Sequence, residues 1–122
     1  MSAEIKFVNL MDIDITLETL DGVLMTLKSP PIKQPLPKVS HEIIKIDHIG
    51  GMPYEVRFKS RVKHLPDPEE NTVYLVSGMI SEVAERNDVL TPSEVGALKD
   101  KNNKIRAYKK LVRYTRGKTE RI

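Results

Sequence analysis

The sequence contains no cysteine, no tryptophan and no long apolar run. The absence of cysteine excludes disulfides and thiolate metal sites. A membrane-spanning helix needs ~20 consecutive apolar residues, and no segment approaches that length, so no membrane contact is expected. The first residues show no basic segment followed by an apolar one, which predicts a cytoplasmic protein without a signal peptide.

Sequence signatures of common enzymes are also missing. Neither phosphate-binding loop, G-x-x-x-x-G-K-[ST] or G-x-G-x-x-G, occurs in the chain, and the hydrolase signature G-x-S-x-G is absent. No cofactor is predicted, and a binding protein is favoured over an enzyme. The length of 122 residues predicts a single domain, residues 1–122.

Positive charge is concentrated at the C-terminal end. The net charge is +3, but residues 99–122 hold ten Lys or Arg and two acidic residues. This segment therefore carries +8, and residues 1–98 carry −5. A basic segment on an acidic body is typical of proteins that bind anionic partners. The simpler interpretation is a solvated final strand and tail.

Two hairpins are predicted in the first half of the chain. Residues 12–19 and 23–27 have alternating apolar patterns around Asp21-Gly22, which predicts a hairpin with a type I′ turn. The strands His41–Ile49 and 54–63 flank Gly50-Gly51 and predict a second hairpin.

Other segments of the first half are a short strand and a loop. Residues 5–10 suggest a short strand, and residues 29–39, with four prolines, predict an extended connection.

The second half contains the clearest helix. The apolar run Val73–Val76 predicts a central strand, and Ser77 is a suitable cap for a helix at about residues 78–87. Ile80, Val83 and Ala84 would lie on the inner face of that helix, with Ser81 and Arg86 among the residues that face water.

Two further elements are expected towards the C-terminus. Thr91-Pro92-Ser93-Glu94 has the form of a capping box and predicts one or two helical turns. Residues 97–114 predict a hairpin around residues 101–104, with a helix over residues 104–114 as the alternative. The chain is therefore expected to adopt an α+β fold. We expect a mainly antiparallel sheet of hairpins, one principal helix, and a basic strand and tail over residues 99–122.

Several motifs of the C-terminal half occur in a fixed order: Leu65-Pro66-Asp67-Pro68, Tyr74-Leu75-Val76-Ser77, the segment Arg86–Pro92, and finally Asp100 and Ile105. This order resembles a family of short uncharacterised bacterial and phage proteins. In that family, Leu-Pro-x-Pro leads into Tyr-Ile-Val-Ser, a helix, Arg-x-Asp-Val-x-x-Pro and an Asp-x-x-Gly-Arg-Val-Ile hairpin. Asn103 replaces the turn glycine of that family, and Asn9-Leu10-Met11-Asp12 departs from its Asn-Leu-Thr-Pro-His opening. The resemblance implies a common fold and a phage or viral origin, but no activity.

The basic C-terminal segment supplies the candidate site residues. Its cations would contact phosphates and its tyrosines would stack on bases, as in proteins that bind single-stranded nucleic acid. The alternative is that both tyrosines anchor the last strand. The candidate nucleic-acid-binding residues are Lys104, Arg106, Tyr108, Lys109, Lys110, Arg113, Tyr114 and Arg116.

Acidic residues and histidines offer a weaker metal hypothesis. The acidic stripe of Asp12, Asp14 and Glu18 would suit Mg²⁺ in a nuclease. The favoured alternative is that this stripe pairs across one solvent face with a basic stripe in the strand 54–63. That basic stripe consists of Arg57, Lys59, Arg61 and Lys63.

The chain has three histidines, His41, His48 and His64. His41 and His48 are seven residues apart, which places them on opposite faces of a regular strand, so no metal site is assigned.

Three functions follow in order of preference. The first is a non-catalytic binding or assembly module of a phage, virus or microbe. It would contact a protein partner, or a second copy through an unpaired edge strand. The second is nucleic-acid binding through the basic segment, and the third is a metal-dependent nuclease.

Overall fold

The computed structural model describes residues 4–114, apart from the side chains of residues 58–60. The fold is α+β, as the sequence predicted, with most of the regular structure in strands of several small sheets. Its elements are β1 Lys6–Asn9, β2 Ile15–Glu18, β3 Leu24–Leu27, β4 Lys38–Ile49, β5 Met52–Lys63, β6 Thr72–Leu75, α1 Gly78–Ala84, β7 Val89–Pro92, β8 Leu98–Lys99, β9 Ile105–Ala107 and β10 Leu111–Val112.

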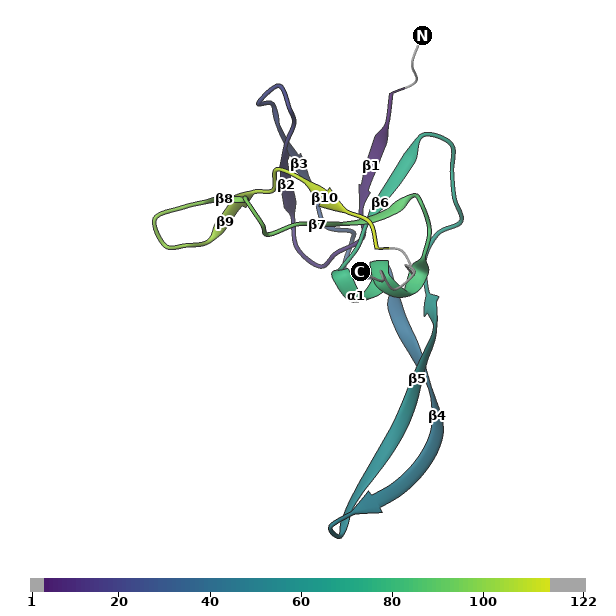
Figure 1. Ribbon diagram of the computed structural model, residues 1–122. Helices are drawn as coiled ribbons and strands as arrows, with labels where there is room; N and C mark the ends of the chain where they lie inside the picture. Colours follow the sequence, from purple (N-terminus) through teal and green to yellow (C-terminus); the bar gives the residue numbers. More distant parts are fainter. Residues whose placement is uncertain (1–3, 115–122) are drawn as a thin grey trace, which may run out of the picture.

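A four-stranded sheet forms the centre of the molecule, in the order β1-β6-β7-β10 (Figure 1). The predicted hairpins are antiparallel, but β1, β6 and β7 run parallel to one another. Parallel neighbours need a crossover, and α1 provides it between β6 and β7. The apolar run Val73–Val76 lies in the middle of this unit, as expected, and Leu75 and Val76 are fully buried.

Side chains of β6 and of Val76, the residue after it, belong to two apolar clusters. Tyr74 and Val76 pack with Ile80 of α1 and Val89 of β7, whereas Leu75 packs with Ile15 and other residues of the β2–β3 hairpin. Successive residues of a strand point to opposite faces, so the clusters lie on the two sides of the sheet. The helix covers one side and the first hairpin covers the other.

The first hairpin closes through a different turn from the predicted type I′ turn. Gly22 has a positive φ of 79°, whereas Asp21 does not have a positive φ, and the Gly22 N–H donates to the Thr19 carbonyl at 2.9 Å. Thr19 N–H also donates to the Val23 carbonyl. These features define a three-residue loop with a bulge. At the second hairpin both Gly50 and Gly51 have positive φ, and the sequence prediction of a Gly-Gly turn is confirmed.

The principal helix is present but shorter than residues 78–87. It ends at Ala84 because Glu85 adopts the left-handed conformation, with φ of 51°. Ser77 occupies the N-cap position, but its side chain makes no capping hydrogen bond. Ser81, expected to face water, is 1% exposed, and its hydroxyl donates to the Val89 carbonyl at 3.4 Å.

The capping-box prediction at Thr91-Pro92-Ser93-Glu94 is wrong. Thr91 and Pro92 belong to β7, where they pair with Val112 and Leu111 of β10. This long-range pairing overrides the local helical preference.

The last predicted hairpin is confirmed, and the alternative helix over residues 104–114 is wrong. Asn103 has a left-handed φ of 64°, and the Asp100 carboxylate accepts hydrogen bonds from the N–H groups of Asn102 and Lys104.

Asn9 connects β1 to the first hairpin. Its side-chain amide donates to the carbonyls of Ile13 at 2.8 Å and Leu27 at 3.1 Å, and its oxygen accepts from Met11 N–H at 2.8 Å. Asn9 is 6% exposed, so these bonds satisfy a buried polar group. The bonds hold the β2–β3 hairpin against the central sheet.

Arg86 joins the loop before β6 to the loop before β7, rather than facing water as expected. Its guanidinium donates to both Asp88 carboxylate oxygens, at 2.9 and 2.6 Å, and to the Pro66 carbonyl at 2.8 Å. It also lies 5.9 Å from the centre of the Tyr74 ring, whose hydroxyl donates to the Asp67 carbonyl at 3.1 Å. We call Pro66, Asp67, Tyr74, Arg86 and Asp88 the Arg86 clamp.

The hydrogen bonds from Arg86 lower the pKa of Asp88 below its usual value of 3.8. A carboxylate with a lowered pKa stabilises the fold above its pKa in the unfolded chain, and that contribution is lost as the pH falls through the folded pKa. Pro66, Tyr74, Arg86 and Asp88, which lie in the motifs from which a resemblance was expected, thus have a structural role in this chain.

Replacing Asp88 with Asn is expected to lower the free energy of unfolding by about 1.5–3 kcal/mol at pH 7, because the half-buried guanidinium loses its charged partner. Urea titration at pH 7 and at pH 3 measures this. The difference between the original chain and the variant should shrink at the lower pH. The control Asp21→Asn, in an exposed turn, should change the stability by less than about 0.5 kcal/mol. An equal loss at both pH values would contradict a role for the ionised carboxylate.

Candidate interaction surface

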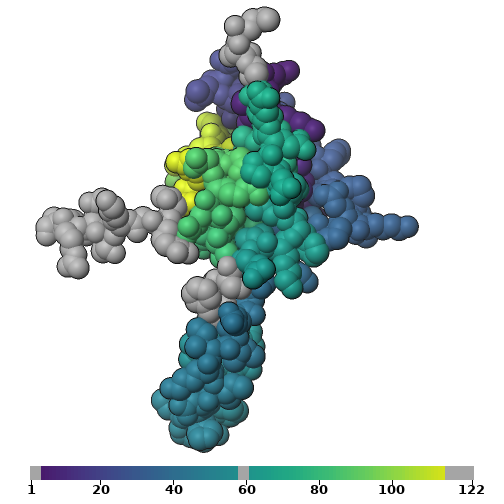
Figure 2. All heavy atoms as spheres, turned by 90° about the vertical axis from the view of Figure 1, so that its right-hand side faces the viewer, coloured from purple at the N-terminus to yellow at the C-terminus, as the bar shows by residue number. Residues whose placement is uncertain are grey.

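A long hairpin projects from the body of the molecule. Among the described residues, the strands β4 and β5, each of 12 residues, pair only with each other, and they extend away from α1 (Figures 1 and 2). Only the base of this hairpin packs on the core, where Val39, Val62 and the adjacent Leu65 contact the cluster of Tyr74 and Ile80. We call residues 42–57, beyond this base, the outer arm.

The outer arm exposes an unusual amount of apolar surface. Seven large apolar side chains are between 40% and 73% exposed, and their exposed fractions add up to about four whole side chains. Covering them would contribute roughly 6–12 kcal/mol before the costs of association are counted. Exposed apolar surface of this extent marks an interaction site. The residues are Ile43, Ile44, Ile46, Ile49, Met52, Tyr54 and Val56.

The register of the strands sorts these side chains onto two faces. Cross-strand partners share a face, so Ile46 lies beside Glu55 and Ile43 beside Arg57. We call this the Ile46 face. Lys45 with Val56 and Asp47 with Tyr54 lie on the opposite face, which we call the Tyr54 face; Ile49 and Met52 continue it at the tip.

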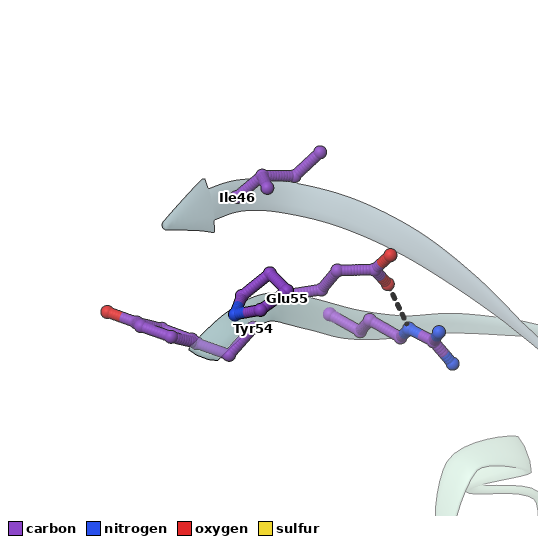
Figure 3. Close-up of a pocket in the computed structure, with 5 residues that line it drawn as sticks. Ile46, Tyr54 and Glu55 are labelled. Carbon is purple, nitrogen blue, oxygen red and sulfur yellow. Dashed lines mark hydrogen bonds and ion pairs between the residues drawn. The ribbon is translucent and has the colours of Figure 1, made fainter. Parts of the chain in front are cut away.

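Each face combines apolar side chains with one ion pair between residues two positions apart. On the Ile46 face, Arg57 Nε lies 2.8 Å from Glu55 Oε2; on the Tyr54 face, Lys45 Nζ lies 3.3 Å from Asp47 Oδ2. Figure 3 shows Ile46 on β4, the Glu55 ion pair along β5 and the Tyr54 ring extending away from that pair. An open hollow of about 410 Å³ is lined by Ile46, Pro53, Tyr54, Glu55 and Arg57.

The edges of the outer arm are poor templates for an added strand. Pro53 has no N–H, and the N–H of its cross-strand partner His48 donates to the Asp47 carboxylate at 2.8 Å. The register shifts between Ile43 and Lys45, so Ile44 is unpaired in β4. Proline and bulges are the devices by which natural sheets prevent edge pairing. The faces of the arm, rather than its edges, are therefore the accessible binding surface.

The candidate nucleic-acid residues follow the last two strands. Lys104 and Arg106 lie in the β8–β9 hairpin, Lys109 and Lys110 precede β10, and Arg113 and Tyr114 follow it. All six side chains are exposed. Arg116 lies outside the described residues.

Tyr108 occupies a different position from these cations. Its ring is half-buried against the cluster of Leu17 and Leu75, and its backbone N–H and carbonyl bond to Thr16 and Glu18 of β2. Burial raises the pKa of its hydroxyl. Tyr108 thus anchors the segment between β9 and β10, which is the structural alternative that the sequence left open for it.

The exposed cations have few partners in the described part of the chain. Lys109 Nζ lies 4.0 Å from Glu18 Oε1, and Arg113 donates to the Asn87 side-chain oxygen at 2.9 Å. Within residues 4–114, Lys104, Arg106 and Lys110 form no ion pair. They are available to an anionic ligand.

The acidic residues Asp12, Asp14 and Glu18, at and before β2, are not brought together with other metal ligands among the described residues. Asp14 accepts a hydrogen bond from Ser29 N–H at 2.9 Å and lies 3.4 Å from Lys28 Nζ. The bond from Ser29 is the main cause of its lowered pKa. Across the described residues, no three His, Asp or Glu side chains form a metal-binding group. His41, His48 and His64 are exposed.

The expected pairing of the acidic and basic stripes is wrong. Of the acidic stripe, Glu18 alone lies in a strand, β2, which pairs with β3, and the strand β5, which holds the basic stripe, pairs with β4. Two local hairpins form in place of the long-range pairing, because each has its own turn.

Sequence reasoning identified the strands of the outer arm but missed its exposure. The available signal was the distribution of isoleucines in β4, where Ile43, Ile44, Ile46 and Ile49 do not keep to one face. A two-stranded hairpin on a small body can bury only one of its faces, so apolar residues on both indicate a further contact.

Comparison of the chain with models of protein families, with curated proteins and with solved structures finds no match. Over the range that the structure describes, no helix is long and apolar enough to cross a membrane. The assignment of a function therefore depends on the geometry of the chain itself.

Replacing Ile46 with Asp is expected to change the free energy of unfolding by less than about 0.5 kcal/mol, because its side chain is 70% exposed. The same substitution at Val62, which packs against the core at the base of the arm, should lower the free energy of unfolding by about 2 kcal/mol or more. Urea unfolding of the two variants tests this contrast. Equal losses would mean that the outer arm is part of the folded core.

Proposed function

We propose that this chain is a non-catalytic binding or assembly module and that the outer arm is its contact element. The observation that carries the proposal is the set of seven exposed apolar side chains on a hairpin that leaves the body. The Arg86 clamp supports it, because it holds the loop that directly follows β5. The clamp thereby ties the loop at the end of the arm to the central sheet and helix.

The energetics are consistent with such a role. Ordering two partners costs an estimated 4–15 kcal/mol, which is comparable to the gain from covering the apolar surface of one outer arm. A partner that contributes apolar surface of its own therefore makes association favourable. An isolated two-stranded hairpin is marginally stable in water, so the partner would also stabilise the outer arm.

A photo-crosslinking amino acid at position 46 or at position 54, one on each face of the arm, is expected to form adducts with a bound protein inside cells that make the chain. The matched control places p-benzoylphenylalanine at position 20, where the native Leu20 is fully exposed on the body. Denaturing gels and mass spectrometry identify the adducts. Adducts from position 46 or position 54 and none from position 20 support the proposal. If neither arm position forms an adduct, the arm is not a contact element.

Nucleic-acid binding through the basic segment is the second candidate. The exposed cations without ion-pair partners, Lys104, Arg106 and Lys110, favour it. Tyr108 is half-buried against the cluster of Leu17 and Leu75, so this binding would rest mainly on phosphate contacts.

Replacing Lys109 and Lys110 with Glu is expected to weaken binding to a mixed single-stranded oligonucleotide and to reduce the slope of log K against log salt by about 1.4, or 0.7 per phosphate contact. Fluorescence anisotropy at several salt concentrations measures both effects. The control Lys33→Glu changes an exposed charge in the proline-rich loop and should have little effect. Binding that is undetectable for the original chain at low salt would remove this candidate.

The phage, viral or microbial origin and the cytoplasmic location stay predictions of the sequence; for a viral protein the location would be the host cytoplasm. The metal-dependent nuclease has no supporting group of ligands among residues 4–114.

A further inference from the structure

We infer that the partner of the outer arm is the outer arm of a second copy of this chain, in an antiparallel arrangement that joins the two Ile46 faces. The inference deepens the proposed function and rests on it. It follows from three features of the arm: the order of its charges, the shape of the Ile46 face and the distribution of charge between arm and body.

The order of charges makes the Ile46 face complementary to itself. Glu55 and Arg57 lie two residues apart on this face, with 36% and 59% of their side chains exposed. A two-fold axis at the level of Val56 places Glu55 of each copy opposite Arg57 of the other, provided that the arms run antiparallel. A parallel arrangement would instead bring like charges together. In the antiparallel arrangement, by contrast, the four charges of the two copies form an alternating group across the interface.

The same axis brings apolar side chains into contact. Ile43 is the cross-strand partner of Arg57, and Ile46 is the cross-strand partner of Glu55. All four residues lie on the Ile46 face. Ile43 of one copy therefore meets Ile46 of the other, beside the hollow lined by Ile46 and Pro53. These isoleucines are 53% and 70% exposed in the single chain, and the contact would cover both.

The distribution of charge favours the antiparallel over the parallel orientation of two copies. The outer arm, residues 42–57, has a net charge of −1, which leaves +4 for the rest of the chain. Two positively charged bodies repel each other, and an antiparallel crossing places them at opposite ends of the paired arms. The contact is confined to one face of a hairpin, which is typical of small, reversible interfaces. A dimer with a Kd in the micromolar range is therefore expected.

Charge exchange tests both the partner and the orientation. The Glu55→Arg variant carries two cations on the Ile46 face, and the Arg57→Glu variant carries two anions. Each variant alone is expected to dimerise at least tenfold more weakly than the original chain. An equimolar mixture should form a heterodimer at least as tight as the original dimer, because every cation then meets an anion. Sedimentation velocity of the full chains over a range of concentrations measures this.

Controls separate pairing from damage to the arm. The double variant Glu55→Arg, Arg57→Glu keeps an opposite-charge pair and should regain dimerisation, whereas Lys33→Glu, outside the arm, should leave it unchanged. An original chain that stays monomeric at high micromolar concentration, or a mixture that does not dimerise, overturns the inference. If position 46 or position 54 still crosslinks to another protein, the proposed function survives that result. If neither position forms an adduct, both fail.

Discussion

The Arg86–Asp88 ion pair is the interaction on which the arrangement of this molecule depends. One guanidinium holds the carboxylate that precedes β7, the carbonyl of Pro66 in the loop after the arm, and the face of the Tyr74 ring in β6. Its side chain is 25% exposed and that of Asp88 is 18% exposed, so water competes weakly for these bonds. The clamp therefore connects the loop that follows β5 to the β6–α1–β7 unit.

The two sides of the central sheet serve different purposes. The hairpin β2–β3 covers one cluster and closes the core there, with the amide of Asn9 as the connection. The helix covers the other cluster, which also receives Val39 and Val62 from the base of the arm. Because the arm and the helix share this cluster, the base of the arm is packed into the body, and the outer arm extends beyond it.

The predictable parts of the structure were those decided by neighbouring residues. Gly50-Gly51 and Asn103 specify their turns through backbone conformations that few other residues tolerate, and the alternation around Ile15 and Tyr54 specifies strands. The parallel pairing of β1 with β6 was not predictable, because it joins distant segments whose patterns contain no mutual signal. The exposure of the outer arm was not predicted for a related reason. Alternation of apolar and polar residues with a period of two identifies a strand, but it does not show which other residues cover that strand.

The topology of the arm has a consequence for the order in which the chain leaves the ribosome. Within residues 4–114, all pairing partners of β4 and β5 lie in residues 38–63, so this hairpin can form while the rest is still being made. The central sheet is complete only when β10, at Leu111–Val112, becomes available. The nascent chain thus exposes the isoleucines of the arm before the central sheet has formed. The unpaired Ile44 and the missing N–H of Pro53 hinder edge-to-edge strand pairing between nascent chains on the same polysome.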